Sequence, residues 1–484
     1  MNNKQLIVQK YGGTSLGGTG RINNVISIID NYINKSNNNL AVVVSAFNFT
    51  NKTSGTTSSL LRAMTNATTG EPFNEIISNL KNQHIGITKE LLPNNKDLQD
   101  TEYFITDKFD ELRKLLNDIH STNRIINGKE ENIIAKTGEQ LAAFILSKVI
   151  NDRGIKAEYV DLSEIFYQKE FSSKNIPFFA ILENKLRNLI SPMINENVLP
   201  IITGYMGEWA YGIVTTIGRG YSDLTASLVA GSLSADECQI WKDVDGIFTA
   251  DPKSVTNAKL LTEITPEEVS ELTFLGSEVL HPYTLEQTMR TGVPLRIRNT
   301  FQPELQGTLI RSKIKNEKTD IEDLKELVDD MDIKSLATKR EVTLIKLAFL
   351  KNLENNEHNH LSNIYKIFKN YNTYAKQVTD NDSDFSIVVE ENNGNLDRLT
   401  KELEKFGKVS LLRGYSTVSV VGRGIREKSS IAGNIVSCLT NNCIPIKMIT
   451  QGDSKIDISC LLESKYLDRA ISTIHENFII NNNN

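Results

Sequence analysis

The first 46 residues constrain the fold most, because two kinds of hydrophobic pattern alternate within them. Residues 5–10 (QLIVQK) predict a buried strand that runs into glycines, and residues 40–46 (LAVVVSA) predict a second buried strand rich in β-branched residues. Between them, residues 20–35 carry apolar side chains at helical spacing. A strand, a helix and a strand in this order indicate a βαβ unit and therefore a parallel sheet.

The α/β pattern continues to about residue 310. Residues 58–125 are polar and predict a mostly helical excursion from the sheet, and a helix is expected at 138–151. Further short strands are expected at 157–161, 198–203, 238–241 and 294–298. We therefore predict an α/β domain with a parallel-rich sheet between helices over residues 1–311.

The C-terminal part has a different character. Residues 312–335 are charged and predict a linker. Residues 413–480 contain strands and helices in the order of a split βαββαβ unit, as in ferredoxin-like domains. A weaker copy of the same order precedes it at 336–412. Two small tandem modules are therefore expected after the α/β domain.

Composition excludes several classes of function. Apolar residues make up 39% and charged residues 24%, and the formal net charge of −6 argues against general nucleic-acid binding. The four cysteines form no CxxC pair, which favours reduced thiols in a cytoplasmic protein. No apolar run reaches the roughly 20 residues that span a bilayer, so no membrane partner is expected. His358 and His360 lie in a polar loop that favours solvent over a metal, and no metal site is predicted.

The first group of candidate site residues follows the first predicted strand, in the run Lys10-Tyr11-Gly12-Gly13-Thr14-Ser15. Glycines let backbone N–H groups turn toward an anion without obstruction by Cβ. A lysine beside them can offset the charge that spreads over a phosphoryl group during transfer. An ordinary βα turn is an equally good explanation of this run alone. The chain has no GxxxxGK[ST], so a P-loop is not the explanation.

The second group is Gly218-Arg219-Gly220-Tyr221-Ser222-Asp223, ahead of an apolar helix. Ser222 is expected to cap this helix, and the glycine-rich approach also suits an anion. Arg219 can grip a carboxylate with two parallel hydrogen bonds. Asp223 can either favour the helix dipole or hold Lys10 by charge pairing.

Two further segments are, taken alone, weaker indicators of a functional site. Residues 241–253 (WKDVDGIFTADPK) carry Asp-Gly and Asp-Pro turn signals, which also fit a plain surface turn. Glu139 is expected to open the helix at 138–151, where a carboxylate favours the helix dipole. The dipole is the usual reason for such a carboxylate, and the functional alternative is that Glu139 receives the ammonium group of an amino-acid substrate.

Taken together, these segments resemble the aspartate kinases. KYGGTS is similar to the family's Lys-Phe-Gly-Gly-Thr-Ser signature, with Tyr11 in place of phenylalanine. GRGYSD, WKDVDGIFTADPK and LGSEVLHP follow in the family's order, and SGTTSSLL, NDRG and TPEEVSEL look closest to fungal-type enzymes. The resemblance covers nearly the whole chain. It implies an amino-acid-kinase fold followed by tandem ferredoxin-like ACT domains, the first of them degenerate.

The resemblance also implies roles for individual residues. Lys10 would stabilise the transferring phosphoryl group, and Asp223 would orient Lys10. The phosphates would lie against Gly12, Gly13, Thr14 and Ser15. The nucleotide site would be lined by Lys242, Asp243, Phe248 and Lys253.

On the substrate side, Glu139 would bind the α-ammonium of aspartate, and Arg219 and Ser222 its α-carboxylate. The full set of substrate-binding residues implied by the resemblance is Ser45, Thr50, Glu139, Arg219, Gly220 and Ser222. The implied co-substrate is ATP with Mg²⁺. Because the substrate carboxylate is already a nucleophile, positioning and charge stabilisation must do most of the work.

The implied reaction is phosphorylation of L-aspartate to 4-phospho-L-aspartate, the first step toward threonine, methionine and isoleucine, and in some organisms lysine. The ACT-like modules imply feedback control, with threonine as the expected effector, and a homo-oligomer. Three alternatives remain: a kinase of glutamate, acetylglutamate or a nucleotide, the kinase half of a bifunctional kinase–dehydrogenase, and a non-catalytic amino-acid-binding regulator. The absence of a GxGxxG fingerprint and the presence of Lys10 and Asp223 argue against the last two.

Overall fold

A computed structural model shows how the chain folds. The residues that it describes are 4–49, 55–93, 96–122, 124, 126–167, 176–209, 217–218, 220–277, 279–312, 332–349, 357–371, 373, 375, 377–380, 384–390 and 395–480. They form two compact units. The first comprises Met1–Ile247, Thr262–Pro266 and Leu280–Glu317, and the second comprises Phe248–Leu261, Glu267–Val279 and Lys318–Asn484.

The first unit is built on an eight-stranded sheet in the order β3-β4-β2-β1-β5-β7-β8-β6. Its strands are β1 (Leu6–Tyr11), β2 (Asn39–Val44), β3 (Ala157–Tyr167), β4 (Leu199–Glu208), β5 (Glu237–Lys242), β6 (Glu263–Ile264), β7 (Leu295–Asn299) and β8 (Thr308–Ile310). The pairs from β3 across to β7 are parallel, whereas β7 and β8 are antiparallel. The chain moves outward from β1 to β2 first and crosses to β5 later, so the strand order reverses at β1. Ligands of open α/β sheets bind at such a reversal, beyond the carboxyl ends of the strands.

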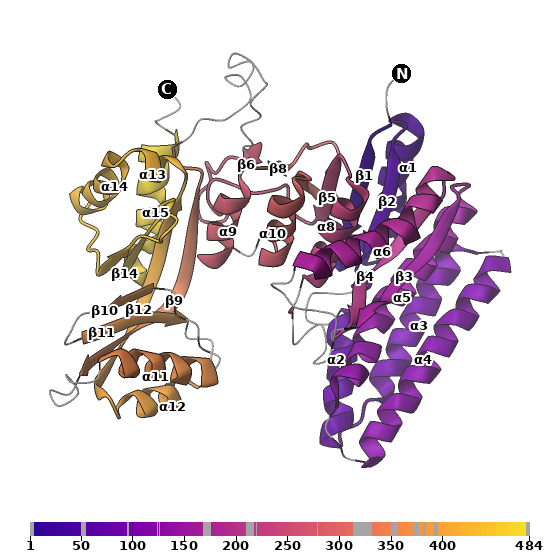
Figure 1. The fold of residues 1–484 in the computed structure, drawn as a ribbon, viewed down its shortest axis with the longest axis horizontal. Helices are drawn as coiled ribbons and strands as arrows, with labels where there is room; N and C mark the ends of the chain where they lie inside the picture. Colours follow the sequence, from indigo (N-terminus) through magenta and orange to yellow (C-terminus); the bar gives the residue numbers. More distant parts are fainter. Residues whose placement is uncertain are drawn as a thin grey trace. The chain divides into compact units, whose positions relative to one another are not determined.

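Helices cover both faces of this sheet (Figure 1). They are α1 (Thr19–Asp30), α2 (Thr56–Thr69), α3 (Asn74–Leu91), α4 (Lys96–Thr122), α5 (Gly128–Asp152), α6 (Ile176–Asn195), α8 (Tyr221–Leu233) and α10 (Pro282–Thr291). Ile7 and Tyr11 of β1 pack in a core with α1 and the α2–α5 helices. Lys10, between them in sequence, points to the other face, against α8. The predicted helical excursion at 58–125 is confirmed as α2, α3 and α4.

Helix α5 begins ten residues earlier than the sequence predicts. Asn127 accepts a hydrogen bond from the backbone N–H of Glu130, and the Glu130 side chain accepts one from the backbone N–H of Asn127. This capping box satisfies two donors at the helix start, so the helix begins at Gly128. The prediction that Glu139 opens the helix was wrong, because Glu139 lies in the middle of α5.

The second unit is built on a six-stranded antiparallel sheet in the order β10-β11-β9-β12-β14-β13. Its strands are β9 (Ser335–Phe349), β10 (Gln377–Asp380), β11 (Asp384–Glu390), β12 (Gly407–Val421), β13 (Met448–Thr450) and β14 (Asp457–Glu463). Its helices are α9 (Pro266–Phe274), α11 (Glu357–Asn370), α12 (Leu396–Leu403), α13 (Gly424–Glu427), α14 (Ser430–Asn441) and α15 (Leu467–His475).

The long strands β9 and β12 run through the whole of this sheet. The first part of β9 pairs with the last part of β12, and the last part of β9 pairs with the first part of β12. Helices α11 and α12 pack over one core and helices α14 and α15 over another. Two ferredoxin-like halves are therefore present, and the predicted division between residues 412 and 413 falls inside β12.

Some of the sequence predictions are untested by the structure, and others are incomplete. Most of the predicted linker at 312–335 lies outside the described residues. The sequence patterns did not predict α6, α9, α10 or the short strands β6 and β8. In the described part of the chain, no helix is both long and apolar enough to cross a membrane.

Candidate active site

A cavity of about 290 Å³ lies at the carboxyl ends of β1 and β2, where the strand order reverses. The residues that line it come from the β1–α1 turn, the end of β2, the start of α2, the middle of α5 and the start of α8. The predicted site residues among them are Lys10, Gly12, Gly13, Thr14, Ser45, Glu139, Gly220 and Ser222.

A buried charged centre adjoins this cavity through Lys10, which lines it. The Nζ of Lys10 is 2.7 Å from one carboxylate oxygen of Asp223, and the Nζ of Lys242 is 3.4 Å from the other. Lys10 and Asp223 are 6% and 4% exposed. Burial alone would raise the pKa of Asp223, but the positive charges of Lys10 and Lys242 outweigh it and lower the pKa to about 2. The centre therefore carries two cations and one carboxylate, and its net positive charge suits an anionic ligand.

The glycine turn after β1 approaches its neighbours too closely for a side chain. The backbone N–H of Gly12 donates to the carbonyl of Trp241 at the end of β5, 3.3 Å away. A Cβ on Gly13 would lie 2.6 Å from the carbonyl oxygen of Ala46. The turn can therefore lie flat against the end of β2 only with glycine at this position.

The two hydroxyl residues of this turn differ in their placement. Thr14 lines the cavity. The hydroxyl of Ser15 is buried and lies 2.7 Å from that of Thr300, in a hydrogen bond directed away from the cavity. The structure thus brings Lys10, Gly12, Gly13 and Thr14 to the cavity but not the side chain of Ser15.

Helix α8 begins at Tyr221 rather than after a serine cap. Gly220 is the N-cap residue, and its φ of 94° lies in the left-handed region that glycine adopts without strain. The prediction that Ser222 caps the helix was therefore wrong. Because the turn occurs earlier, the Ser222 hydroxyl is available to hydrogen-bond that of Ser45, 2.8 Å away at the end of β2.

Glu139 is the buried carboxylate of the cavity. It is 2% exposed, and one of its oxygens has no hydrogen-bond partner. Burial raises the pKa of Glu139 to about 8, although the charge of Lys10 and the hydroxyl of Tyr221 lower it in part. A Cβ on Gly204 would lie 2.8 Å from the carbonyl of Val44 and 3.3 Å from a Glu139 oxygen, so glycine in β4 keeps space beside the carboxylate. A buried carboxyl group with one unpartnered oxygen is suited to a cationic ligand group.

The predicted nucleotide residues fall in both units. Lys242 belongs to the charged centre, and Asp243 is exposed just after β5. Phe248 lies in the second unit, where its carbonyl accepts a hydrogen bond from the Ser335 hydroxyl. Lys253 is exposed in the same unit. Their role toward a nucleotide stays a prediction, and Thr50 and Arg219 lie outside the described residues.

The sequence patterns missed part of the cavity wall at the start of α2. Thr56, Thr57 and Ser58 line the cavity, together with Asn48. The hydroxyl of Thr56 and the amide oxygen of Asn48 are buried and have no hydrogen-bond partner in the structure. The signal was available, because Gly55-Thr56-Thr57 immediately precedes a run of helix-forming residues.

His281 has a structural role. It is the N-cap residue of α10, where its Nδ1 accepts a hydrogen bond from the backbone N–H of Tyr283. Its other ring nitrogen contacts the carbonyl of Ile217. Both ring nitrogens are therefore engaged with the backbone, and His281 is not a candidate acid or base.

Comparison with known families and proteins identifies similar chains. Residues 5–299 match the model of the amino acid kinase family, and residues 418–478 match an ACT domain. The chain is 33% identical to the aspartokinase of Saccharomyces cerevisiae over 97% of its own length and 92% of the relative's length.

Two solved structures are also similar. The aspartate kinase of Clostridium acetobutylicum has a TM-score of 0.76 at 26% identity, covering 98% of this chain and 100% of the other. Aspartokinase III of Escherichia coli, solved in complex with aspartate and ADP, has a TM-score of 0.73 at 23% identity. It covers 98% of this chain and 99% of the other and shares the fold.

Proposed function

Because this chain belongs to the amino acid kinase family and is an aspartate kinase, we propose that it transfers the γ-phosphate of ATP to the side-chain carboxylate of L-aspartate. The product would be 4-phospho-L-aspartate. The observation that carries this proposal is that Lys10, paired with Asp223 in the charged centre that also holds Lys242, lines the same cavity as the buried Glu139.

The charged centre would serve the phosphoryl group. The acceptor carboxylate is ionised at neutral pH, so the reaction needs no general base. What the site must supply is alignment and positive charge where negative charge spreads over the phosphoryl oxygens. Lys10, held by Asp223, and Lys242 would provide that charge, while the flat glycine turn would bring backbone N–H groups close to the phosphates. Mg²⁺ would enter bound to ATP as part of the co-substrate.

Glu139 would select an amino acid. Glu139 lines the cavity, and one of its oxygens has no hydrogen-bond partner; an α-ammonium group bound beside it would supply the missing counter-charge. Ser45 and Ser222, already joined by a hydrogen bond, would turn their hydroxyls to the substrate's carboxylates. Arg219 is proposed to grip the α-carboxylate, as the resemblance implies.

This role of Glu139 predicts a pH dependence of aspartate binding. With the pKa of Glu139 near 8 in the free protein, binding of an ammonium group below pH 8 must first remove a proton from the carboxyl group. The aspartate affinity should therefore rise by up to about tenfold per pH unit between pH 6 and 8, and then level off. The measurement is the KM for aspartate across this range at saturating MgATP. A flat profile would contradict the assignment.

The raised pKa of Glu139 also makes the free energy of unfolding depend on pH in a predictable direction. The folded-state pKa of Glu139 lies above its unfolded value, so the folded protein holds the proton more tightly between about pH 4.5 and 8. The contribution of Glu139 should thus make the free energy of unfolding fall as pH rises through this window. Urea unfolding at several pH values, compared between the parent and Glu139→Gln, isolates this contribution.

We further propose that the enzyme catalyses the first step toward threonine, methionine and isoleucine and that threonine inhibits it through the ACT-like unit. The match of residues 418–478 to an ACT domain supports a regulatory role. Inhibition needs an effector that binds two states of the enzyme with different affinity. If saturating threonine leaves both kcat and the KM for aspartate unchanged, threonine control is excluded. A homo-oligomer is proposed on the same family resemblance.

The test of the function is an ATP-dependent assay that traps the acyl phosphate with hydroxylamine. Aspartate should give hydroxamate, whereas glutamate at the same concentration should give far less. Equal rates with both would point to a broader carboxylate kinase. No product at millimolar aspartate would favour the non-catalytic regulator.

A further inference from the structure

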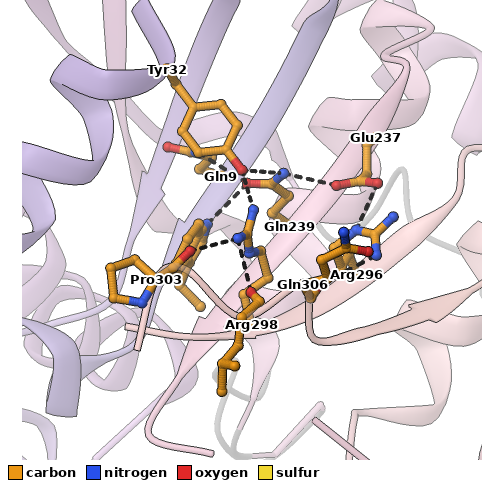
Figure 2. Close-up of polar contacts among 10 residues, drawn as sticks. Gln9, Tyr32, Glu237, Gln239, Arg296, Arg298, Pro303 and Gln306 are labelled. Atoms are coloured by element: carbon orange, nitrogen blue, oxygen red, sulfur yellow. Dashed lines mark hydrogen bonds and ion pairs between the residues drawn. The ribbon is translucent and has the colours of Figure 1, made fainter. Parts of the chain in front are cut away.

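Figure 2 shows a chain of polar side chains on one face of the sheet. This is the face opposite Lys10, because Gln9 and Lys10 are consecutive in β1 and side chains alternate along a strand. At the centre of this chain of side chains, Gln9 of β1 and Gln239 of β5 are register partners across the parallel pair. The side-chain amide of Gln9 donates to the amide oxygen of Gln239 at 3.0 Å. The two residues are 0% and 2% exposed, so this pair is buried within the sheet.

Two aromatic residues of β1 and β5 bond to the same pair. The hydroxyl of Tyr11 donates to the Gln9 amide oxygen at 3.0 Å, and the indole N–H of Trp241 donates to the Gln239 amide oxygen at 3.1 Å. Tyr11 and Trp241 are also register partners, and their rings stack with centroids 5.9 Å apart. Both amide oxygens are therefore satisfied by neighbours on the same two strands, and the amide nitrogen of Gln239 donates to Glu237 of β5 at 2.8 Å.

Tyr32 and Arg298 extend the chain of contacts to a third strand and to the segment after α1. The amide nitrogen of Gln239 donates to the Tyr32 hydroxyl at 3.0 Å, and Arg298 of β7 donates to the same oxygen. The guanidinium of Arg298 also donates to the carbonyls of Pro303 and Leu305 and lies 4.7 Å from the Trp241 ring centroid. Figure 2 shows Arg298 reaching between Tyr32 and Pro303.

The cluster residues on β1 and β5 are sequence neighbours of the two lysines of the charged centre. Lys10 lies between Gln9 and Tyr11 in sequence, and Lys242 follows Trp241. Because side chains alternate along a strand, a shift of one residue in either strand would turn its lysine to the wrong face. The apolar residues of β1 are buried on both faces and specify the register weakly, whereas a buried amide that must find its partner specifies it strongly.

We propose that Gln9 and Gln239, supported by Tyr32 and Arg298, are positioning residues that hold β1 and β5 in the register placing Lys10 and Lys242 on Asp223. This inference rests on the proposed function and concerns the geometry of the same site. A ligand site in the open cleft of about 300 Å³ beside the cluster is a weaker reading. The polar groups of the cluster bond mainly to one another, and a ligand would have to break those bonds.

The test is a double-mutant cycle. Gln9→Met keeps the length of the side chain and removes its hydrogen bonds. It should lower kcat by roughly 10- to 100-fold, because small misplacements of catalytic groups have effects of this size. If Gln9 acts by placing Lys10 on Asp223, the same change in an Asp223→Asn background should lower kcat by less than about threefold. Equal losses in both backgrounds would overturn the proposal, since a merely structural role gives independent effects.

Controls separate this outcome from instability and from failure of the proposed function. Arg311→Gln removes an ion pair with Glu263 of β6 at the far edge of the same sheet. Among the described residues its side chain bonds to no member of the cluster, so kcat should stay within about twofold. If Gln9→Met does not fold, Tyr32→Phe removes a single hydroxyl and should still lower kcat severalfold. A parent enzyme without hydroxamate would refute the function. An active parent whose Gln9→Met and Tyr32→Phe variants are folded and fully active would refute only the positioning role.

Discussion

Replacing Lys10 by methionine should lower kcat by roughly 10³-fold, the scale of effects seen when a charge that stabilises the transferring phosphoryl group is removed. The variant should remain folded. Asp223 keeps a second cation, Lys242, at 3.4 Å, so the substitution does not leave an isolated buried carboxylate. The measurement is the hydroxamate assay on protein whose thermal unfolding midpoint has been determined.

A matched control is Lys148→Met, the same substitution at another ion-paired lysine of the same unit. Lys148 lies on α5, 3.0 Å from Asp97, and does not line the cavity. Its loss should leave kcat within about twofold, as expected for a partly exposed ion pair. A folded Lys10→Met enzyme with more than a tenth of the parent kcat would show that Lys10 is not the main phosphoryl-stabilising cation.

Replacing Glu139 by glutamine should raise the KM for aspartate by at least roughly 30-fold while kcat changes much less. The substitution keeps the shape of the side chain but removes the charge that faces the ammonium group, and truncating one partner of a buried charge pair typically costs about 2–5 kcal/mol. The rise in affinity between pH 6 and 8 should disappear in the same variant, because no carboxyl group remains to titrate.

Glu130→Gln provides the comparison on the same helix. Glu130 belongs to the capping box of α5, where glutamine is an accepted substitute, and it pairs with Arg124 away from the cavity. This variant should change stability but not the KM for aspartate. If Glu139→Gln binds aspartate as well as the parent does, the ammonium group must bind elsewhere in the cavity.

The sequence predicted the centre of the site better than its walls. Lys10 and Asp223 were paired on the basis of family resemblance, and the structure places them 2.7 Å apart although 213 positions separate them. The strands that carry Lys10 and Lys242 have patterns that periodicity detects. In contrast, the local signal at Thr56 and Thr57 marks only the start of a helix after Gly55, and it does not show that they line the same cavity as Lys10.

The errors have local physical causes. The start of α5 was misplaced because the Asn127–Glu130 capping box is a signal from side-chain chemistry, and the hydrophobic pattern alone does not reveal it. Strand β12 is longer than the apolar run at 416–422, because its first half pairs with β9 through polar residues such as Lys408 and Ser410. Backbone pairing with a distant strand therefore decided its length, and a single sequence does not show which strand that is.

The shared strands β9 and β12 also decide how the second unit can be altered. Cutting the chain between the two halves would split β12. The backbone groups of β9 that pair with it would then form a new exposed sheet edge, which is prone to aggregation. The two halves thus share β9 and β12 as common central strands. Neither half can be transplanted alone into another protein without carrying a piece of the other, so an exchange of this unit must move both halves together with the core residues that Phe248–Leu261 contributes.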